Sequence, residues 1–218
     1  MSPPARLWLE LAEARASRPG ARRSRHPALG EAHLAALEKK AQKLKATLVF
    51  LDESGFSLLP TPCKTWAPRG QTPLLYHCFN WPKLSAISAV TPNPHAYLRL
   101  VRGTIRSPQV IGFVRHLLRG IPGMVFLFWD GLNTHRSKTT RAALREHYPR
   151  LRVYRLPAYA PELNPDEGLW AWMKQHALCG QCPPNLEVLE QSIRLALRRL
   201  RRRPQIIRSF FRRCPLSF

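Results

Sequence analysis

The stretch MVFLFW (Met124–Trp129) is an unbroken apolar run that ends at Asp130. A second run, TLVFL (Thr47–Leu51), ends in the same way at Asp52. Short runs rich in β-branched and aromatic residues are typical of strands that are covered on both faces of a sheet. The sequence therefore predicts two buried strands, each of which ends at a carboxylate.

The segment between these runs predicts a helical crossover. Ser107 is a suitable helix cap, Pro108 a suitable first residue, and apolar residues recur at helical spacing as far as Gly120. A crossover of this kind makes its two strands parallel, and as neighbours they would lie about 4.8 Å apart. We therefore expect Asp52 and Asp130 to lie close enough to share a bound cation.

The rest of the chain alternates between strand and helix signals, which predicts an α/β fold with a mixed sheet and helices on both faces. A turn at residues 91–94 should join two strands in antiparallel fashion. Between Phe56 and Pro82 we expect irregular structure or a hairpin around Arg69-Gly70. The further expected strands are 84–90, 97–101 and 151–156, and the further expected helices are 31–45, 137–147, one from Pro165, and 186–200.

Charge points to a polyanionic partner. The 218 residues carry 35 Lys plus Arg against 13 Asp plus Glu, a formal net charge of +22, and nucleic acid neutralises such a field best. The apolar runs are too short to span a bilayer, and no secretory signal is visible. Five irregularly spaced cysteines fit a reducing compartment, so a cytoplasmic protein is expected and a zinc site at Cys179 and Cys182 is set aside.

Acidic residues are scarce, and the positions of the aspartates favour a metal site. The only three aspartates are Asp52, Asp130 and Asp166, and the last of these lies in Asn164-Pro165-Asp166-Glu167 at a predicted helix start. Glu167 could be a third metal ligand or half of a capping box, and Asp166 competes for either role. Carboxylates from distant segments suit two Mg²⁺ ions that assist phosphodiester cleavage.

Three blocks resemble the catalytic domain of IS630-type transposases of the Tc1/mariner superfamily. They are LDESGF (51–56), WDGLNTHRS (129–137) and LPAYAPELNPDEGLW (156–170), and 36 residues separate Asp130 from Glu167. The resemblance implies an RNase H-like fold and a DDE triad of Asp52, Asp130 and Glu167. It also implies two Mg²⁺ or Mn²⁺ ions, cleavage at the ends of a mobile element, and transfer of the freed strand to target DNA.

Other residues are expected to assist this site or to bind DNA. Glu53 and His135 could hold the carboxylates in position, and His135 or Lys174 could instead contact DNA. Nine arginines and no acid lie between Arg194 and Arg213, which favours a phosphate-facing surface or a tail. From this segment we expect nucleic-acid contacts by Arg194, Arg198, Arg199, Arg201, Arg202 and Arg203.

These expectations divide the chain into three parts. Residues 1–45 form a basic arm and linker helix, residues 46–182 the RNase H-like DDE catalytic domain, and residues 183–218 a basic C-terminal helix and tail. The family carries helix-turn-helix modules that 45 residues cannot contain, so a half encoded upstream is a candidate partner. Family analogy also suggests a homodimer on DNA, in a bacterial cytoplasm and nucleoid.

Departures from the family pattern leave alternatives open. Gly131 stands where many relatives have Asn, and Gly168 lies in a first helical turn, where glycine is costly. The chain could instead be a non-catalytic basic DNA-binding remnant, or another RNase H-like nuclease that acts in repair or RNA processing.

Overall fold

The computed structural model describes residues 27–60, 67–70, 82–157 and 160–214. The predicted basic arm lies almost entirely outside these residues. So do residues 61–66 and 71–81 of the segment for which irregular structure or a hairpin was expected, although Arg69 and Gly70 form a turn.

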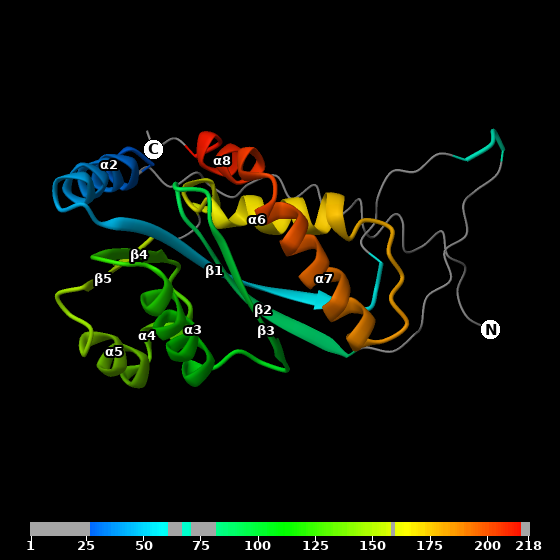
Figure 1. Ribbon diagram of the computed structural model, residues 1–218, viewed down its shortest axis with the longest axis horizontal. Helices are drawn as coiled ribbons and strands as arrows, with labels where there is room; N and C mark the ends of the chain where they lie inside the picture. Colours follow the sequence, from blue (N-terminus) through cyan, green and yellow to red (C-terminus); the bar gives the residue numbers. More distant parts are fainter. Residues whose placement is uncertain (1–26, 61–66, 71–81, 158–159, 215–218) are drawn as a thin grey trace.

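A five-stranded mixed sheet organises the fold in the order β3-β2-β1-β4-β5 (Figure 1). The central strand β1 pairs with β2 in antiparallel fashion and with β4 in parallel fashion. β3 and β5 are the two edge strands, antiparallel to β2 and parallel to β4 respectively. The strands are β1 (Thr47–Ser57), β2 (Lys83–Val90), β3 (Ala96–Arg102), β4 (Val125–Trp129) and β5 (Leu151–Arg155).

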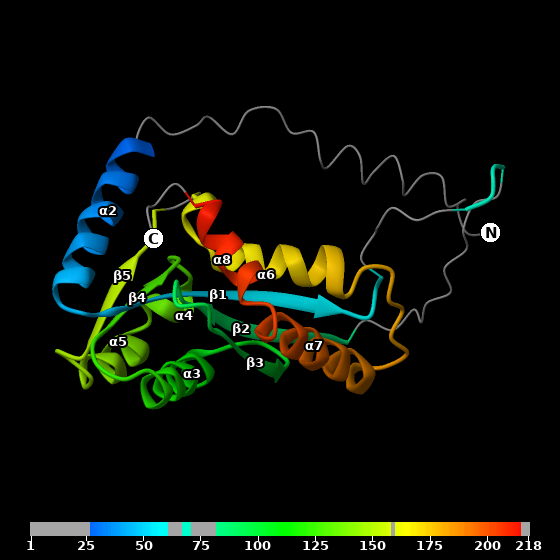
Figure 2. The ribbon, with the colours of Figure 1, turned by 45° about the horizontal axis from the view of Figure 1, so that its top comes forward.

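Helices cover both faces of this sheet, as Figure 2 shows. One apolar cluster joins α2 (Pro27–Lys43), α6 (Asp166–Trp172), α7 (Leu186–Arg201) and α8 (Pro204–Arg212) to one face of the strands. A second cluster joins α3 (Ser107–Gly120) and α5 (Lys138–Arg145) to the opposite face. Short elements complete the chain: α4 (Asn133–Arg136), a 3-10 turn (Pro161–Leu163) and a π-helical turn (Met173–Ala177).

The predicted parallel pairing of the two apolar runs is confirmed, but the predicted end of the first strand is wrong. Asp52 was expected to end that strand, whereas β1 continues to Ser57. The strand extends because it changes partner. Thr47–Phe50 pair with β4, and Phe50–Ser57 pair with β2. Asp52 therefore lies inside a strand, just beyond the end of its parallel ladder.

The start of α3 also differs from the prediction. Ser107 is the first helical residue, and Arg106 occupies the cap position, where its backbone N–H donates to the Gln109 side chain at 3.1 Å. The Ser107 hydroxyl is hydrogen bonded instead to the hydroxyl of Ser137 at 2.8 Å. Ser137 is the side-chain cap of α5, since it accepts a hydrogen bond from the backbone N–H of Thr140.

The arginine-rich C-terminal segment is not only a tail, because it includes the helix α8. Ile207, Phe210 and Phe211 are buried in the core, while the arginines of α8 are exposed. A Cβ atom on Gly168 would lie 2.8 Å from the Phe210 ring, so only glycine lets α8 approach α6 this closely. None of the described helices is both long and apolar enough to cross a bilayer.

Candidate active site

The parallel ladder between β1 and β4 brings two aspartates to one region. Phe50 pairs with Phe128, and their rings stack with centroids 4.9 Å apart and an interplanar angle of 16°. Asp52 and Asp130 each lie two residues further along the chain, and side chains two residues apart on a strand share a face. Both aspartates line the same cavity, as their register requires.

The first turn of α6 brings a third acid to this cavity. Glu167 is exposed and lines it, whereas its neighbour Asp166 is fully buried and accepts a hydrogen bond from the Ser88 hydroxyl on β2. The Asn164 side chain, which also lines the cavity, accepts a hydrogen bond from the Asp166 backbone N–H at 3.2 Å. Of the two adjacent acids, Glu167 is therefore the one that can reach a ligand in the cavity.

The cavity has a volume of about 530 Å³ and is rich in oxygen ligands. Three carboxylates and the Asn164 amide line it, a donor set that suits a hard divalent cation. Within the described ranges, however, no three His, Cys, Asp or Glu side chains are already grouped closely enough to hold a metal ion. Side-chain rotation would be needed before all three acids could contact one ion.

The electrostatics of Asp52 show an excess of negative charge. Burial raises the pKa of Asp52 to about 7, and the carboxylates of Glu167 and Asp130 raise that pKa as well. The backbone N–H of Glu53 donates to Asp52 at 2.8 Å and lowers its pKa only in part. A divalent cation would relieve the same repulsion, so these residues fit a metal.

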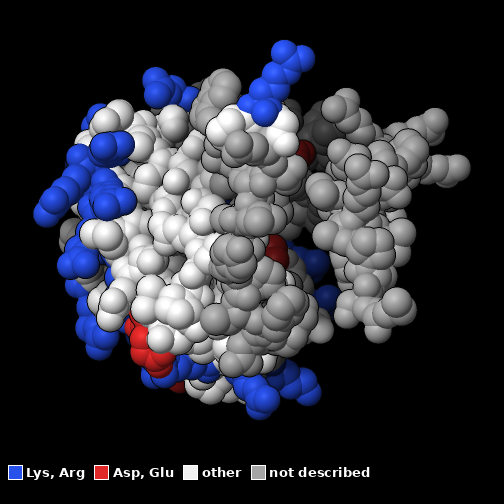
Figure 3. Space-filling model, turned by 90° about the vertical axis from the view of Figure 1, so that its right-hand side faces the viewer, with Lys and Arg blue, Asp and Glu red and all other residues white. Residues whose placement is uncertain are grey.

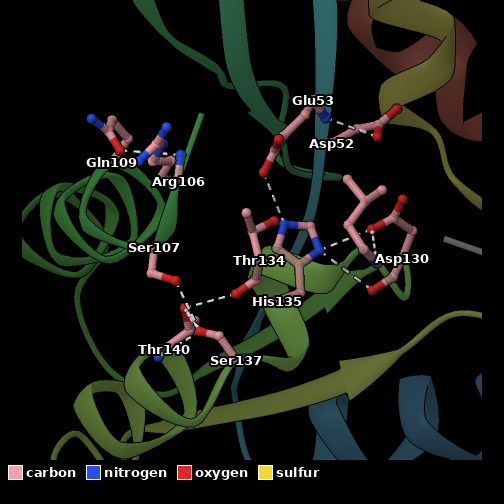
Figure 4. Close-up of polar contacts among 11 residues, drawn as sticks. Asp52, Glu53, Arg106, Ser107, Gln109, Asp130, Thr134, His135, Ser137 and Thr140 are labelled. Atoms are coloured by element: carbon pink, nitrogen blue, oxygen red, sulfur yellow. Dashed lines mark hydrogen bonds and ion pairs between the residues drawn. The ribbon is translucent and has the colours of Figure 1, made fainter. Parts of the chain in front are cut away.

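A buried histidine links two acids that lie on either side of it, as Figure 4 shows. The His135 Nδ1 atom lies 2.9 Å from a carboxylate oxygen of Asp130, and its Nε2 atom lies 3.1 Å from one of Glu53. Glu53 follows Asp52 on β1, so the two side chains point to opposite faces of the sheet. Glu53 thus contacts His135 and is not among the residues that line the cavity.

This contact keeps both partners charged at neutral pH. Burial alone would lower the pKa of His135, but the hydrogen bonds to Asp130 and Glu53 raise it to about 9. Burial also opposes ionisation of Asp130, yet the bonds from His135 and from the Leu132 N–H lower its pKa below the ordinary value. His135 is only 3% exposed, so it holds Asp130 in place and is too buried to contact a phosphate directly.

Lys174 lies on the π-helical turn, and its side chain contacts β1 and does not line the carboxylate cavity. Its ammonium donates to the Ser54 hydroxyl at 2.7 Å and lies 5.7 Å from the centroid of the Phe56 ring. Trp170, one turn after Glu167, is buried against the same Phe56 ring at 5.8 Å. Trp170 lowers the pKa of Asp52 from this position, although its indole N–H has no acceptor within hydrogen-bonding distance among the described residues.

Comparison with known proteins decides the family. Residues 47–190 match the model of the DDE superfamily endonucleases. The chain belongs to this family. The matched range includes all five strands, the helices α3 to α6 and every acid of the cavity.

Solved structures share the fold of this DDE endonuclease. A Mos1 transposase paired-end complex with the left transposon end superimposes with a TM-score of 0.68 and 19% identity, over 96% of this chain and 67% of that one. The Mos1 mariner paired-end complex with Mn gives 0.71 and 19%, over 91% and 61%. The isolated Mos1 catalytic domain gives 0.59 and 17%, over 93% and 100%.

These matches confirm the RNase H-like architecture. They also show how much of the Mos1 chains the present chain covers. This DDE endonuclease spans about two thirds, or less, of the longer Mos1 chains, and it covers the catalytic domain in full. No curated protein matches it in sequence.

The arginines that were expected to bind nucleic acid lie on α7 and in the turn to α8, and their environments differ. Arg194 forms a 2.7 Å ion pair with Glu190, and the Arg201 side chain donates to the carbonyl of Ala96 at 2.8 Å. The structure brings neither of them to the carboxylate cavity. Figure 3 shows one face of this DDE endonuclease, where basic side chains are frequent along the outline and acidic ones are few. All six of these arginines are exposed, and besides Arg201 four of them form no ion pair within the described residues: Arg198, Arg199, Arg202 and Arg203.

One residue of the site was missed by the sequence analysis. Arg155, the last residue of β5, lines the cavity beside Asp130 and lowers the pKa of that acid. A Cβ atom on Gly131 would lie 2.5 Å from the Arg155 guanidinium, so the guanidinium takes the space of the missing side chain. The signal in the sequence was the glycine directly after Asp130.

Proposed function

We propose that this chain is the catalytic domain of an IS630-type transposase, which cuts DNA at the ends of a mobile element and joins the freed strand to target DNA. The observation that carries the proposal is the convergence of Asp52, Asp130 and Glu167, from three separate elements, on one cavity of a DDE endonuclease domain. The similar Mos1 structures support the finer assignment, because they contain transposon-end DNA.

In this proposal the three acids hold two divalent ions, Mg²⁺ or Mn²⁺. The Mos1 paired-end complexes with Mn and with Mg support this choice. When bound, such ions supply an activated water or 3′-hydroxyl and stabilise the leaving oxygen of the cleaved phosphodiester.

The residues of the chain itself prepare that site. His135, held by Glu53, keeps Asp130 ionised and oriented toward the cavity. The buried Asp166, bonded to Ser88 on β2, fixes the first turn of α6 and so the place of Glu167. Asp52 supplies a carboxylate that is buried and poorly neutralised, and its charge favours the capture of a cation.

The partners of the enzyme are part of the proposal. The cationic chain would bind the element ends and the target DNA through its arginines. A second copy of the chain and a separately encoded helix-turn-helix half are further candidates, since the chain spans only part of the longer Mos1 proteins.

A nicking assay tests the proposal. Supercoiled plasmid should be nicked by the wild-type protein when Mn²⁺ or Mg²⁺ is added, and Asp130→Asn should abolish this activity. Glu162→Gln is the matched control, because Glu162 is an exposed acid of the 3-10 turn that does not line the cavity. Nicking that survives in Asp130→Asn would refute the assignment.

A metal titration and a comparison of substrates distinguish the transposase from the two alternative functions, a non-catalytic remnant and another nuclease. A non-catalytic basic remnant would bind DNA with the same affinity with and without metal, and it would never cut. It is kept as a candidate because the described acids are not grouped into a ready metal site. An RNase H-like nuclease of repair or RNA processing would cut RNA–DNA hybrids or junctions in preference to duplex DNA.

A further inference from the structure

A second cavity, of about 540 Å³, lies beside the carboxylate cavity and has a different chemical character. Five arginines line it, and Asp130 is the only acid among its lining residues. We call it the arginine cavity. Its arginines come from α4, α5 and β5: Arg136, Arg141, Arg145, Arg152 and Arg155.

The positive charge of this cavity is neutralised only in part from within the protein, through the electrostatic interaction of Asp130 with Arg155. In the part of the chain that the structure describes, none of the five arginines forms an ion pair. The nearest acid in sequence, Glu146, is paired with Arg115 at 3.4 Å, and Asp130 is paired with His135. Arg152 differs from the other four arginines, because its guanidinium lies 5.7 Å from the centroid of the Phe126 ring, on the face of the sheet opposite α5.

The guanidinium groups of Arg136, Arg141 and Arg145, which form no ion pair among the described residues, fit phosphate groups. Guanidinium presents planar paired donors that match a phosphate oxygen pair, and a low-acid cavity favours an anionic ligand. Tyr148 is 68% exposed and Val153 is 38% exposed, and both line the cavity, so it also offers apolar surface to sugars and bases. A phosphodiester chain carries both kinds of group.

The two cavities meet at shared residues. Asp130 and Arg155 line both of them. Arg155 lies against the backbone of Gly131, in space that any side chain there would fill. β5 is an edge strand, so no further strand of the sheet blocks a chain that passes along it. A ligand can therefore extend from the three acids, past Arg155, into the arginine cavity.

We propose that the arginine cavity binds the phosphodiester backbone of the DNA strand that continues from the scissile phosphate. The inference rests on the proposed function only in taking DNA as the substrate. The phosphate to be cut lies at the three acids, and the next phosphates along the strand lie on the arginines of α5 and β5. Arg155 marks the junction between the two.

Fluorescence anisotropy with labelled duplex DNA tests this placement in the absence of divalent metal. The double variant Arg141→Ala/Arg145→Ala should weaken binding by roughly tenfold, and the slope of log K against log salt should fall by about 2, as expected for two lost phosphate contacts. Lys83→Ala/Arg99→Ala is the matched control. It removes the same charge from exposed residues on β2 and β3, toward the opposite edge of the sheet. An equal effect of the two double variants would overturn the proposal.

Chemical modification of the wild-type protein gives a second test that does not depend on variants. Phenylglyoxal modifies accessible arginines, and mass spectrometry locates the products. DNA should protect Arg141 and Arg145, while Arg119 on α3 should react as before. If inorganic phosphate at the same phosphate concentration protects them equally, the cavity binds free anions and the strand assignment is wrong.

The outcome for this cavity can be separated from the outcome for the catalytic proposal. Loss of DNA affinity in Arg141→Ala/Arg145→Ala supports the arginine cavity even if the wild-type protein never nicks DNA. Metal-dependent nicking that is unchanged in that variant supports the three acids and refutes the arginine cavity.

Discussion

The imidazole of His135 lies flat on the indole of Trp129, with ring centroids 4.3 Å apart and an interplanar angle of 0°. This stacking fixes the plane of the histidine, so that its two nitrogens reach Asp130 and Glu53 at the same time. The position of the second acid of the site therefore depends on a ring contact made by the last residue of β4.

Replacement of this histidine should weaken metal binding. His135→Gln keeps a polar side chain but cannot bridge both acids, so the apparent affinity for Mn²⁺ should fall by roughly tenfold or more. Isothermal titration calorimetry measures this directly. His116→Gln, at an exposed position on α3, is the control. Equal Mn²⁺ affinity in both variants would show that His135 does not position Asp130.

The same residue should make stability depend on pH in alkaline solution. The pKa of His135 is about 9 in the folded protein against an ordinary 6.5. A raised pKa means that the stabilisation is fully present below pH 6.5 and is lost as pH rises through 9. The stability advantage of wild type over His135→Gln, measured by urea denaturation, should shrink across this window. A constant difference from pH 6 to pH 10 would contradict it.

Asp52→Asn should stabilise the metal-free protein. The pKa of Asp52 is about 7 when folded and ordinarily 3.8, so its ionisation destabilises the fold as pH rises through 7. At pH 8 the variant should gain about 2 kcal/mol, or about 5 °C in melting temperature, and near pH 3 it should gain little.

Added metal should make the wild-type protein more stable than Asp52→Asn. Mn²⁺ should raise the melting temperature of the wild-type protein but not that of Asp52→Asn, because a ligand that binds only the folded state stabilises it. Glu162→Gln serves as the control for loss of an acid. A variant that is less stable than wild type at pH 8 without metal would argue against repulsion among the three carboxylates.

Gly168→Ala should be destabilising although alanine favours helices. The new Cβ atom would lie 2.8 Å from the Phe210 ring, and Phe210 is only 4% exposed, so the ring has little room to move. We expect a net loss of about 1–2 kcal/mol, after the gain in helix propensity. Gly120→Ala, where nothing lies within 4 Å of the added atom, should be neutral or stabilising in the same thermal melts.

Lys174→Met should leave DNA affinity almost unchanged. The lysine is bound to Ser54 and Phe56 and lines neither the carboxylate cavity nor the arginine cavity. We expect a change in DNA affinity of less than about twofold, since no phosphate contact is lost. A reduced salt dependence of binding would show instead that Lys174 leaves Ser54 and reaches DNA.

The sequence predicted those parts of the site that depend on strand order. Asp52 and Asp130 follow apolar runs joined by a helical crossover, and parallel pairing then brings them together. The sequence did not predict where β1 ends, because the strand continues past Phe50 by pairing with β2. That pairing depends on residues more than 25 positions away along the chain and leaves no local signal in β1. Local propensity also left Asp166 and Glu167 equivalent, until packing buried one of them against Ser88.

Contacts between distant segments were harder to predict. The pairing of Glu53 with His135 joins residues 82 positions apart, and Arg155 meets Gly131 only because β5 lies next to β4. The sequence predicted a basic helix and tail for residues 183–218 but no second helix there, because arginines dominate the composition of α8. Its buried face needs only three residues: Ile207, Phe210 and Phe211.

The close packing of Phe210 on Gly168 ties the far end of the polypeptide to the element that carries Glu167. A stop codon that removed the segment from Pro204 onward would leave every acid of the site in the chain. It would, however, remove the packing of Phe210 against α6, the helix that carries Glu167. Late truncations of such an open reading frame can thus silence the enzyme while leaving its signature motifs intact.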